Sequence, residues 1–239
     1  FFVFSQNLMI PWFWSADTSS HLGRLDYASL SQQTLMEMLI DKLPCKEIIC
    51  NDENEMPDAT EWNGIFAKKN GEITIIEWDV SLGTCLNGRV EFQWLPPHVD
   101  RVTMVDHGLE GTLDCSLLPR KLTRLELSTN DLVGEVALDA LPSTMIAVDL
   151  SQNQFHGSLD LEHLPDTLTT LVLFENGFSG SICLTRLPAG MIELSLEENS
   201  LNGSLDLTSL PPQLEFIDLN NNEFSGRVDL TALPSCLMR

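Results

Sequence analysis

The sequence predicts a solenoid of stacked coils, of the mixed α/β type but mostly β, with an irregular convex side and an N-terminal cap. Two observations support it: a 23-residue recurrence that fills residues 90–239, and a helix-then-strand pattern before it. Recurrence at a fixed period of about 20–50 residues is typical of chains whose coils stack on one another. We therefore divide the chain into an apolar N-terminal segment (1–28), a cap (29–89) and a solenoid (90–239) whose last repeat is incomplete.

A Leu-Pro pair marks each repeat. Seven such pairs are spaced by 23 residues, and their prolines are Pro96, Pro119, Pro142, Pro165, Pro188, Pro211 and Pro234. Proline disfavours helix at the residue before it, so each pair suits the junction between two coils. A glycine keeps the same step from Gly88 to Gly226, where each coil must bend tightly.

Leucines alternate with polar residues before a recurring asparagine. In "LTRLELSTN", Leu125 and Leu127 show the period of a half-buried strand, and Asn130 follows where the chain must turn. A buried amide there can bond to backbone groups that strand pairing leaves free. We predict a ladder of such amides, made of Asn130, Asn153, Asn176, Asn199 and Asn222. His107 stands at this position one repeat earlier, and we expect it to make the same hydrogen bonds.

The cap is predicted from residues 29–89. Leucines at four-residue spacing in residues 29–43 indicate an amphipathic helix that ends before Pro44. Ser29 or Thr34 would cap its start, and Thr34 with Glu37 fits a capping box. The alternation in "GEITIIEWDVSL" then indicates a strand. Helix and strand together would shield the first coil, as the end of a solenoid requires.

These motifs resemble the leucine-rich repeat proteins of kinetoplastid protists, over residues 30–239. The resemblance rests on the repeated L-P-x-x-L-x-x-L-x-L-x-x-N-x-[LF]-x-G-x-L-D-L. The W-N-G-I of Trp62 to Ile65 is also similar to the cap of plant receptor-type repeats, whose second strand stands where this chain has G-x-L-D-L. The resemblance implies a horseshoe-shaped solenoid that binds other macromolecules, with no catalysis and no cofactor.

Composition narrows the function classes. The net charge of −22, from 13 basic and 35 acidic residues, argues against nucleic acid and anionic membranes as partners. No apolar segment is long enough to span a bilayer. No catalytic motif is present and the five histidines share no repeat position, so we expect neither an enzyme nor a cofactor.

A metal site is not expected either. The recurring Asp114, Asp160, Asp206 and Asp229 could suggest a row of cation ligands, but other residue types interrupt that row. Cys45 and Cys50 form a C-x4-C pair without the second pair or nearby histidine of a zinc site. They could be bridged only in an oxidising compartment. The sequence does not determine the cellular compartment of the protein. Of the two choices, it favours an intracellular soluble protein.

The C-terminal end lacks a polar terminal coil in this sequence. Either the natural chain continues, or the last coil presents an open edge through which molecules could assemble.

Residues facing the concave side of the strands vary between repeats, so binding specificity is expected there. Three apolar residues occupy positions that are mostly polar elsewhere: Val172, Phe174 and Phe216. Acidic residues surround them: Glu175, Glu193, Glu197, Glu198 and Asp218. An aromatic centre with a charged rim is typical of a binding hot spot, and the acidic rim implies a protein partner with basic groups.

The sequence thus predicts a non-catalytic protein–protein interaction module or scaffold subunit that binds through its concave face. A cell-surface or secreted receptor-like domain that recognises a peptide or glycan is the alternative. A solvated acidic face without a dedicated ligand is the simplest competing explanation.

Overall fold

The computed structural model describes residues 30–50, 56–79, 82–83 and 85–238. The predicted apolar segment of residues 1–28 lies outside them. The chain separates into two units, Phe1–Leu30 and Ser31–Arg239, and the fold described below is that of the second unit.

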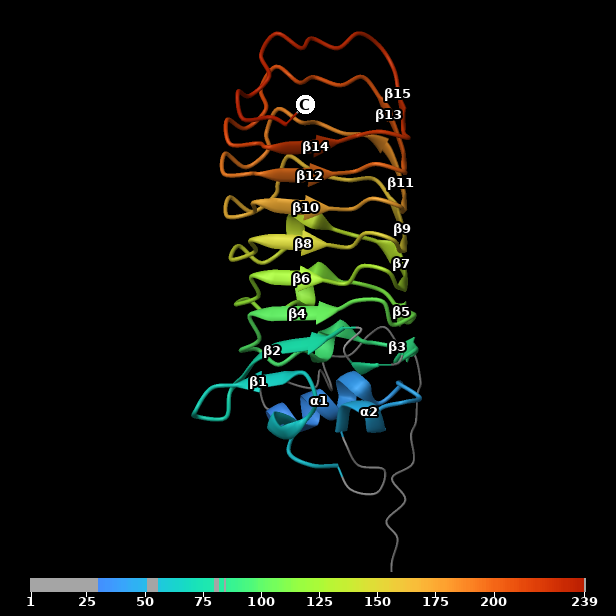
Figure 1. The fold of residues 1–239 in the computed structure, drawn as a ribbon, viewed down its shortest axis with the longest axis vertical. Helices are drawn as coiled ribbons and strands as arrows, with labels where there is room; N and C mark the ends of the chain where they lie inside the picture. Colours follow the sequence, from blue (N-terminus) through green and yellow to red (C-terminus); the bar gives the residue numbers. More distant parts are fainter. Residues whose placement is uncertain (1–29, 51–55, 80–81, 84, 239) are drawn as a thin grey trace, which may run out of the picture. The chain divides into compact units, whose positions relative to one another are not determined.

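One face of the coils is an eight-stranded sheet in the order β1-β2-β4-β6-β8-β10-β12-β14 (Figure 1). Its strands are β1 (Ile65–Ala67), β2 (Ile73–Trp78), β4 (Arg101–Met104), β6 (Arg124–Glu126), β8 (Ala147–Asp149), β10 (Thr170–Val172), β12 (Glu193–Ser195) and β14 (Phe216–Asp218). β1 and β2 form an antiparallel hairpin, and every later pair is parallel. From β4 onward, register partners lie 23 residues apart, as Thr170 does from Glu193. The predicted solenoid, mostly β, is confirmed.

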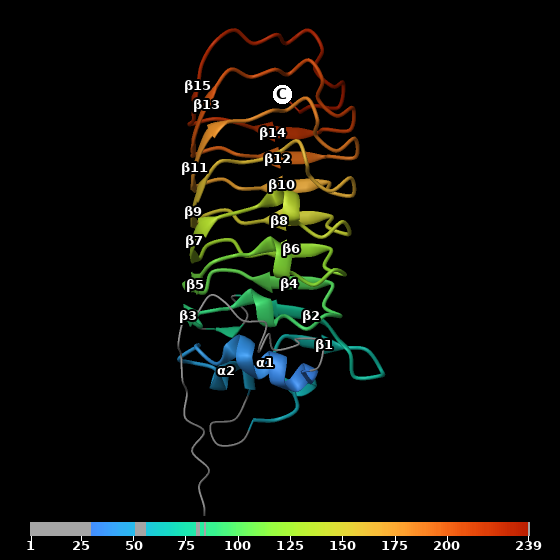
Figure 2. The same ribbon diagram turned by 180° about the vertical axis from the view of Figure 1, so that it is seen from behind.

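A second sheet runs along the other side of the coils, in the order β15-β13-β11-β9-β7-β5-β3 (Figure 2). Its strands are β3 (Gly88–Arg89), β5 (Leu109–Gly111), β7 (Asp131–Glu135), β9 (Gln154–Gly157), β11 (Gly177–Ser181), β13 (Ser200–Gly203) and β15 (Glu223–Phe224). The sequence analysis placed this second strand on the G-x-L-D-L residues. That placement is wrong for most of these residues. The strand lies on the residues before and around the glycine, and the L-D-L part leads into a turn.

A side-chain cap accompanies the turn that follows the second strand in several coils, although not in the coil of Ala137. Asp114 accepts a hydrogen bond from the Ser116 backbone N–H at 3.0 Å and so starts a 3-10 helix, η5 (Cys115–Leu117). The next coil has the corresponding helix η6 (Leu138–Ala140). A short polar side chain that bonds two residues ahead favours a turn over a continuing strand.

The core consists of the repeating apolar residues, mostly leucines, between the two sheets. Leu122, Leu125 and Leu127 are fully buried, and the same three positions are buried in each coil up to that of β12, whereas Ile217 and Leu219 of the β14 coil are half-buried. Each Leu-Pro proline accepts a backbone hydrogen bond from the third residue after it, as Pro142 does from Met145 at 2.9 Å. The prolines therefore fix the turn that feeds each strand of the first sheet.

The cap contains α1 (Gln32–Ile40), α2 (Glu47–Cys50) and a 3-10 helix, η2 (Ala59–Glu61). α1 begins after Ser31, whose side chain accepts from the Thr34 N–H at 3.1 Å. The predicted caps Ser29 and Thr34 are therefore corrected to Ser31, because the first apolar turn places that hydroxyl over the free N–H groups. Glu37 bonds to Gln33 instead of closing a capping box.

The buried face of α1 packs against the 3-10 helix η4 (Phe92–Trp94). β2 joins the sheet beside β4, with Ile76 opposite Val102 and Trp78 opposite Met104. The cap thus continues the core into the first coil. In the part of the chain that the structure describes, no helix has the length and apolar character needed to cross a membrane.

Candidate protein-binding face

The asparagines set the turn that follows each strand of the first sheet. The Asn153 Oδ1 accepts from the buried Leu132 N–H at 3.1 Å. Its Nδ2 donates to the carbonyls of Leu127, Leu150 and Ser151 at 2.9, 3.1 and 3.0 Å. One amide thus joins one backbone donor and three backbone acceptors in two coils. The same pattern recurs at Asn130, Asn176, Asn199 and Asn222.

His107 does not reproduce this pattern, contrary to the sequence-based expectation. The side chain is 1% exposed, and neither ring nitrogen meets hydrogen-bond geometry with a described residue, although backbone groups of Trp78 and Asp79 lie near enough to raise its pKa in part. Burial lowers the pKa of His107 below its ordinary value, because the apolar surroundings disfavour the charged ring. A neutral imidazole ring has one N–H donor and one acceptor nitrogen, whereas the asparagine amide has two N–H donors and an oxygen that accepts. A histidine therefore cannot make as many hydrogen bonds as a ladder asparagine.

A left-handed residue precedes each asparagine of this position in the solenoid. Its φ lies between 51° and 61° at Asp106, Thr129, Gln152, Glu175, Glu198 and Asn221. Their side chains bond sideways from coil to coil: Thr129 to Gln152 at 2.9 Å, Gln152 to Glu175 at 3.0 Å, and Asn221 to Glu198 at 3.4 Å. Glu175 and Glu198 thus belong to a turn at the edge of the sheet and not to its strands.

The eight predicted partner-binding residues therefore form two rows. Val172, Glu193, Phe216 and Asp218 lie on strands β10, β12 and β14. Phe174, Glu175, Glu197 and Glu198 follow the ends of β10 and β12. All eight lie outside the buried core, with Phe216 37% exposed and Val172 and Phe174 half-buried.

The sheet register determines which of these residues are neighbours. Phe216 is the partner of Glu193, and Val172 is flanked by Asp149 and Ser195. Val172 is the last residue of β10 and Phe216 is the first residue of β14, so the two residues lie on different strands and at opposite ends of them. The three apolar residues form a diagonal across the face with acidic residues between them.

Several rim carboxylates are held by hydrogen bonds from their own chain. Glu197 accepts from the Ser195 hydroxyl, and Asp218 accepts from the Asn220 N–H at 2.9 Å. Glu175 and Glu198 accept the sideways bonds described above. A carboxylate has about four acceptor sites, so one such bond orients the group and leaves it able to accept from a partner.

Solved structures that resemble this chain include ectodomains of plant receptor kinases. The leucine-rich repeat ectodomain of the membrane receptor kinase GASSHO1/SCHENGEN3 from Arabidopsis thaliana aligns with a TM-score of 0.60 and 19% identity, over 81% of this chain and 27% of that one. Pollen Receptor Kinase 3 aligns with a TM-score of 0.57 and 23% identity, over 82% and 95%. The fold is a leucine-rich repeat solenoid. No protein-family profile matches the sequence, and no curated protein matches it.

PEPR1 with AtPEP1 aligns with a TM-score of 0.53 and 19% identity. That alignment covers 82% of this chain and 32% of the other, so the chain spans about a third of that ectodomain's length. Because the sequence identities are only 19–23%, these alignments show a shared leucine-rich repeat fold and nothing more specific.

Two exposed isoleucines of the leucine-rich repeat face were missed by sequence reasoning. Ile146 and Ile192 directly precede β8 and β12 and are 36% and 39% exposed. The Ile192 carbonyl accepts from the Phe216 N–H at 3.1 Å, so this isoleucine adjoins the predicted centre. The signal was present, since Thr123, Thr169 and Glu215 fill the same repeat position with polar groups.

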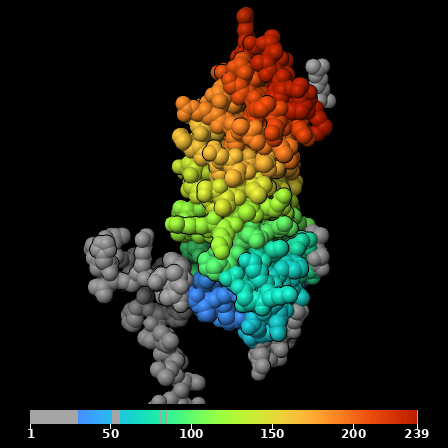
Figure 3. Space-filling view, turned by 90° about the vertical axis from the view of Figure 1, so that its left-hand side faces the viewer, coloured from blue at the N-terminus to red at the C-terminus, as the bar shows by residue number. Residues whose placement is uncertain are grey.

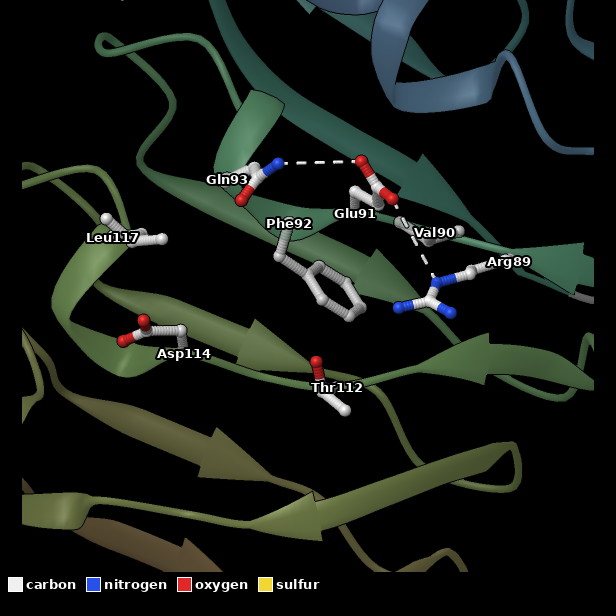
Figure 4. Close-up of a pocket in the computed structure, with 8 residues that line it drawn as sticks. All are labelled: Arg89, Val90, Glu91, Phe92, Gln93, Thr112, Asp114 and Leu117. Atoms are coloured by element: carbon white, nitrogen blue, oxygen red, sulfur yellow. Dashed lines mark hydrogen bonds and ion pairs between the residues drawn. The ribbon is translucent and has the colours of Figure 1, made fainter. Parts of the chain in front are cut away.

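A hollow on the flank of the first coils lies away from the predicted face (Figure 4). Its wall contains Glu91, whose carboxylate accepts from Lys42 and from the Trp94 indole N–H at 3.0 Å, while Arg89 lies 4.0 Å away. The Lys42 ammonium lowers the pKa of Glu91. This carboxylate ties the cap to the first leucine-rich repeat coil and is not placed for acid–base chemistry.

The recurring aspartates of the leucine-rich repeats act as turn caps. Asp206 and Asp229 each accept from the backbone and hydroxyl of the threonine two residues later. Those bonds lower the pKa of both carboxyl groups. Among the described residues, no three His, Cys, Asp or Glu side chains come together as metal ligands.

Proposed function

We propose that this chain is a non-catalytic protein-interaction module, a scaffold or adaptor subunit that binds a partner carrying basic groups. The observation that supports it is the exposed, apolar and acid-rimmed part of the first sheet, over β10, β12 and β14. Phe216 is exposed there beside Glu193. Exposed aromatic side chains ringed by charge are where binding energy concentrates in interfaces.

The test is a triple variant of the apolar centre: Val172→Ser, Phe174→Ser and Phe216→Ser. Partners would be captured on the immobilised wild-type chain, identified by mass spectrometry and then measured for affinity. We expect the triple variant to weaken binding by about 2 kcal/mol or more, which is about 30-fold. Its melting temperature should fall only modestly, because none of the three residues is in the buried core.

The matched control changes exposed apolar residues elsewhere, Leu117→Ser with Val133→Ser, which are 45% and 40% exposed. It should bind as the wild type does. Capture of the same partners by the triple variant at wild-type affinity would refute the proposed surface. Loss of the fold in the triple variant would place those residues in the core and refute it as well.

A second candidate function is a receptor-like domain on the cell surface or outside the cell. It is favoured by the resemblance to receptor ectodomains, two of which are described in complex with CASPARIAN STRIP INTEGRITY FACTOR 2 and with AtPEP1. We further propose that the repeats belong to the 23-residue type that the sequence resembles in kinetoplastid protists.

Two covalent features distinguish the candidates. Cys45 and Cys50 are free thiols in the structure, with Cys50 buried, and Asn202 is an exposed residue of β13 followed by Gly203 and Ser204. After expression through a secretory pathway, a Cys45–Cys50 bridge or a glycan on Asn202 in the peptide masses would favour the receptor. Free thiols in the protein purified from its own cells would favour the scaffold.

A further inference from the structure

Basic residues gather on one flank of this acidic chain, where β2, β4 and β6 begin. Six of the 13 lysines and arginines lie there and are exposed: Lys68 and Lys69 in the β1–β2 turn, Arg101 and Arg124 as the first residues of β4 and β6, and Arg120 and Lys121 in the turn before β6. We call these six residues the basic flank. The strands begin on the left in Figure 1, and Figure 3 views that side.

Side-chain contacts join the parts of the basic flank. Lys121 Nζ lies 3.2 Å from His98 Nδ1, and His98 Nε2 lies 3.7 Å from the Glu72 carboxylate. The same glutamate pairs with Lys68 at 3.4 Å. The β1–β2 turn and the turn before β6 therefore carry adjoining parts of one surface.

Most of this positive charge has no ion-pair partner among the residues that the structure describes. Arg101 and Arg124 are register partners on adjacent parallel strands, so their backbones are about 4.8 Å apart. Among the residues that the structure describes, Arg101, Arg120 and Arg124 form no ion pair. Two like charges side by side repel each other, and an anion bound between them would remove that cost.

Charge is sorted along one line of the first sheet. The first residue of each strand from β4 to β14 runs Arg101, Arg124, Ala147, Thr170, Glu193, Phe216. The line is basic at one end, neutral in the middle, and acidic and apolar at the other. Arg124 and Glu193 are three strand steps apart, about 14 Å, which an extended peptide spans with about four residues.

We propose that the basic flank binds an acidic stretch of the protein partner, whose basic stretch lies about four residues away over Glu193 and Phe216. This inference rests on the proposed function and adds the charge order and orientation of the recognised segment. Suppose an extended segment lies across the strands from Arg124 to Glu193. It meets opposite charge at both of its ends only if its acidic residues are grouped at one end and its basic residues at the other. A segment of the same composition with mixed charges meets like charge at each end.

The test uses two fluorescent peptides of identical composition, DDSLSRR and DRSLSDR, in a polarisation titration at low and physiological salt. The wild-type chain should bind the segregated peptide about tenfold more tightly or better, with the preference shrinking as salt is added. Arg101→Glu with Arg124→Glu should abolish the preference and bind RRSLSRR more tightly than the wild type does. Arg101→Gln with Arg124→Gln is the milder variant, and thermal melts confirm that each variant is folded.

The matched control is Arg186→Glu with Arg227→Glu, which makes the same charge change at exposed arginines outside the basic flank. It should keep the preference. Three results would overturn the inference. The wild-type chain could bind the two peptides equally, it could bind neither, or the preference could survive the Arg101 and Arg124 changes. The inference would also be overturned if an oligonucleotide bound the wild-type chain and failed to bind the Arg101→Glu, Arg124→Glu variant. Partner capture by the Val172, Phe174 and Phe216 variant decides the proposed function separately.

Discussion

Replacing Asn153 with alanine tests the asparagine ladder at one of its two buried members, Asn130 and Asn153. The variant removes the oxygen that accepts the hydrogen bond of the Leu132 N–H. Leu132 is fully buried, so water cannot replace that acceptor. The carbonyls of Leu127 and Leu150 each keep a bond from a neighbouring ladder asparagine. The Ser151 carbonyl keeps its bond from the Thr129 N–H at 3.0 Å, so the Leu132 N–H is the group that the variant affects most.

An orphaned buried backbone group costs about 1–3 kcal/mol, so Asn153→Ala should destabilise the fold by about 1–3 kcal/mol. For a chain of this size the melting temperature should then fall by about 2–12 °C. Asn222→Ala should cost less, because this half-buried residue lets water replace the lost partner.

The assay is thermal and urea unfolding followed by circular dichroism, with Asn202→Ala as the control. Asn202 is an exposed asparagine of β13 outside the ladder, so its removal should change stability by less than about 0.5 kcal/mol. A melting temperature of Asn153→Ala equal to that of Asn202→Ala would refute the assignment of the ladder as a source of stability.

Two further predictions concern the first coil and the cap. His107→Asn should raise the melting temperature and flatten its pH dependence in melts at pH 7.5 and pH 5. Burial lowers the pKa of His107, so the unfolded chain binds the proton more tightly and the wild type loses stability as pH falls below about 6.5. Gly88→Ala should destabilise far more than Gly71→Ala although their φ values are +83° and +82°. A Cβ at Gly88 would lie 2.6 Å from the Lys42 carbonyl, whereas at Gly71 it meets nothing within 4 Å, and equal melting temperatures would contradict this packing.

The repeat pattern predicted the parts of the fold that a shared core determines. Leu125, Asn130 and Pro142 each occupy a position where every coil faces the same surroundings, so the period alone indicates their roles. The start of α1 was not determined in this way, because Ser29, Ser31 and Thr34 can all cap a helix and only the packing of its buried face selects Ser31. The second strand was misplaced because glycine suits either a strand end or a turn.

The candidate site was selected from the sequence by residue type, and its geometry could not be selected in that way. Val172, Phe174 and Phe216 stand out against polar residues at the same repeat positions, and the structure leaves them outside the buried core. The left-handed conformation of Glu175 could not be read from the sequence, since glutamate has no preference for positive φ. Nor could the isolation of the His107 ring, which depends on what surrounds it in three dimensions.

The constant register of the first sheet has a consequence for the length of the segment that the proposed site would bind. A duplicate of residues 143–165 inserted after Pro165 would add one full coil, because from β4 onward each strand of the first sheet pairs with residues 23 positions away. The Arg101–Arg124 pair would then lie about 4.8 Å farther from Glu193. The preferred spacing between acidic and basic residues in a bound peptide should lengthen by one to two residues. Selectivity for length is thus adjustable in whole-coil steps without changing a single contact residue.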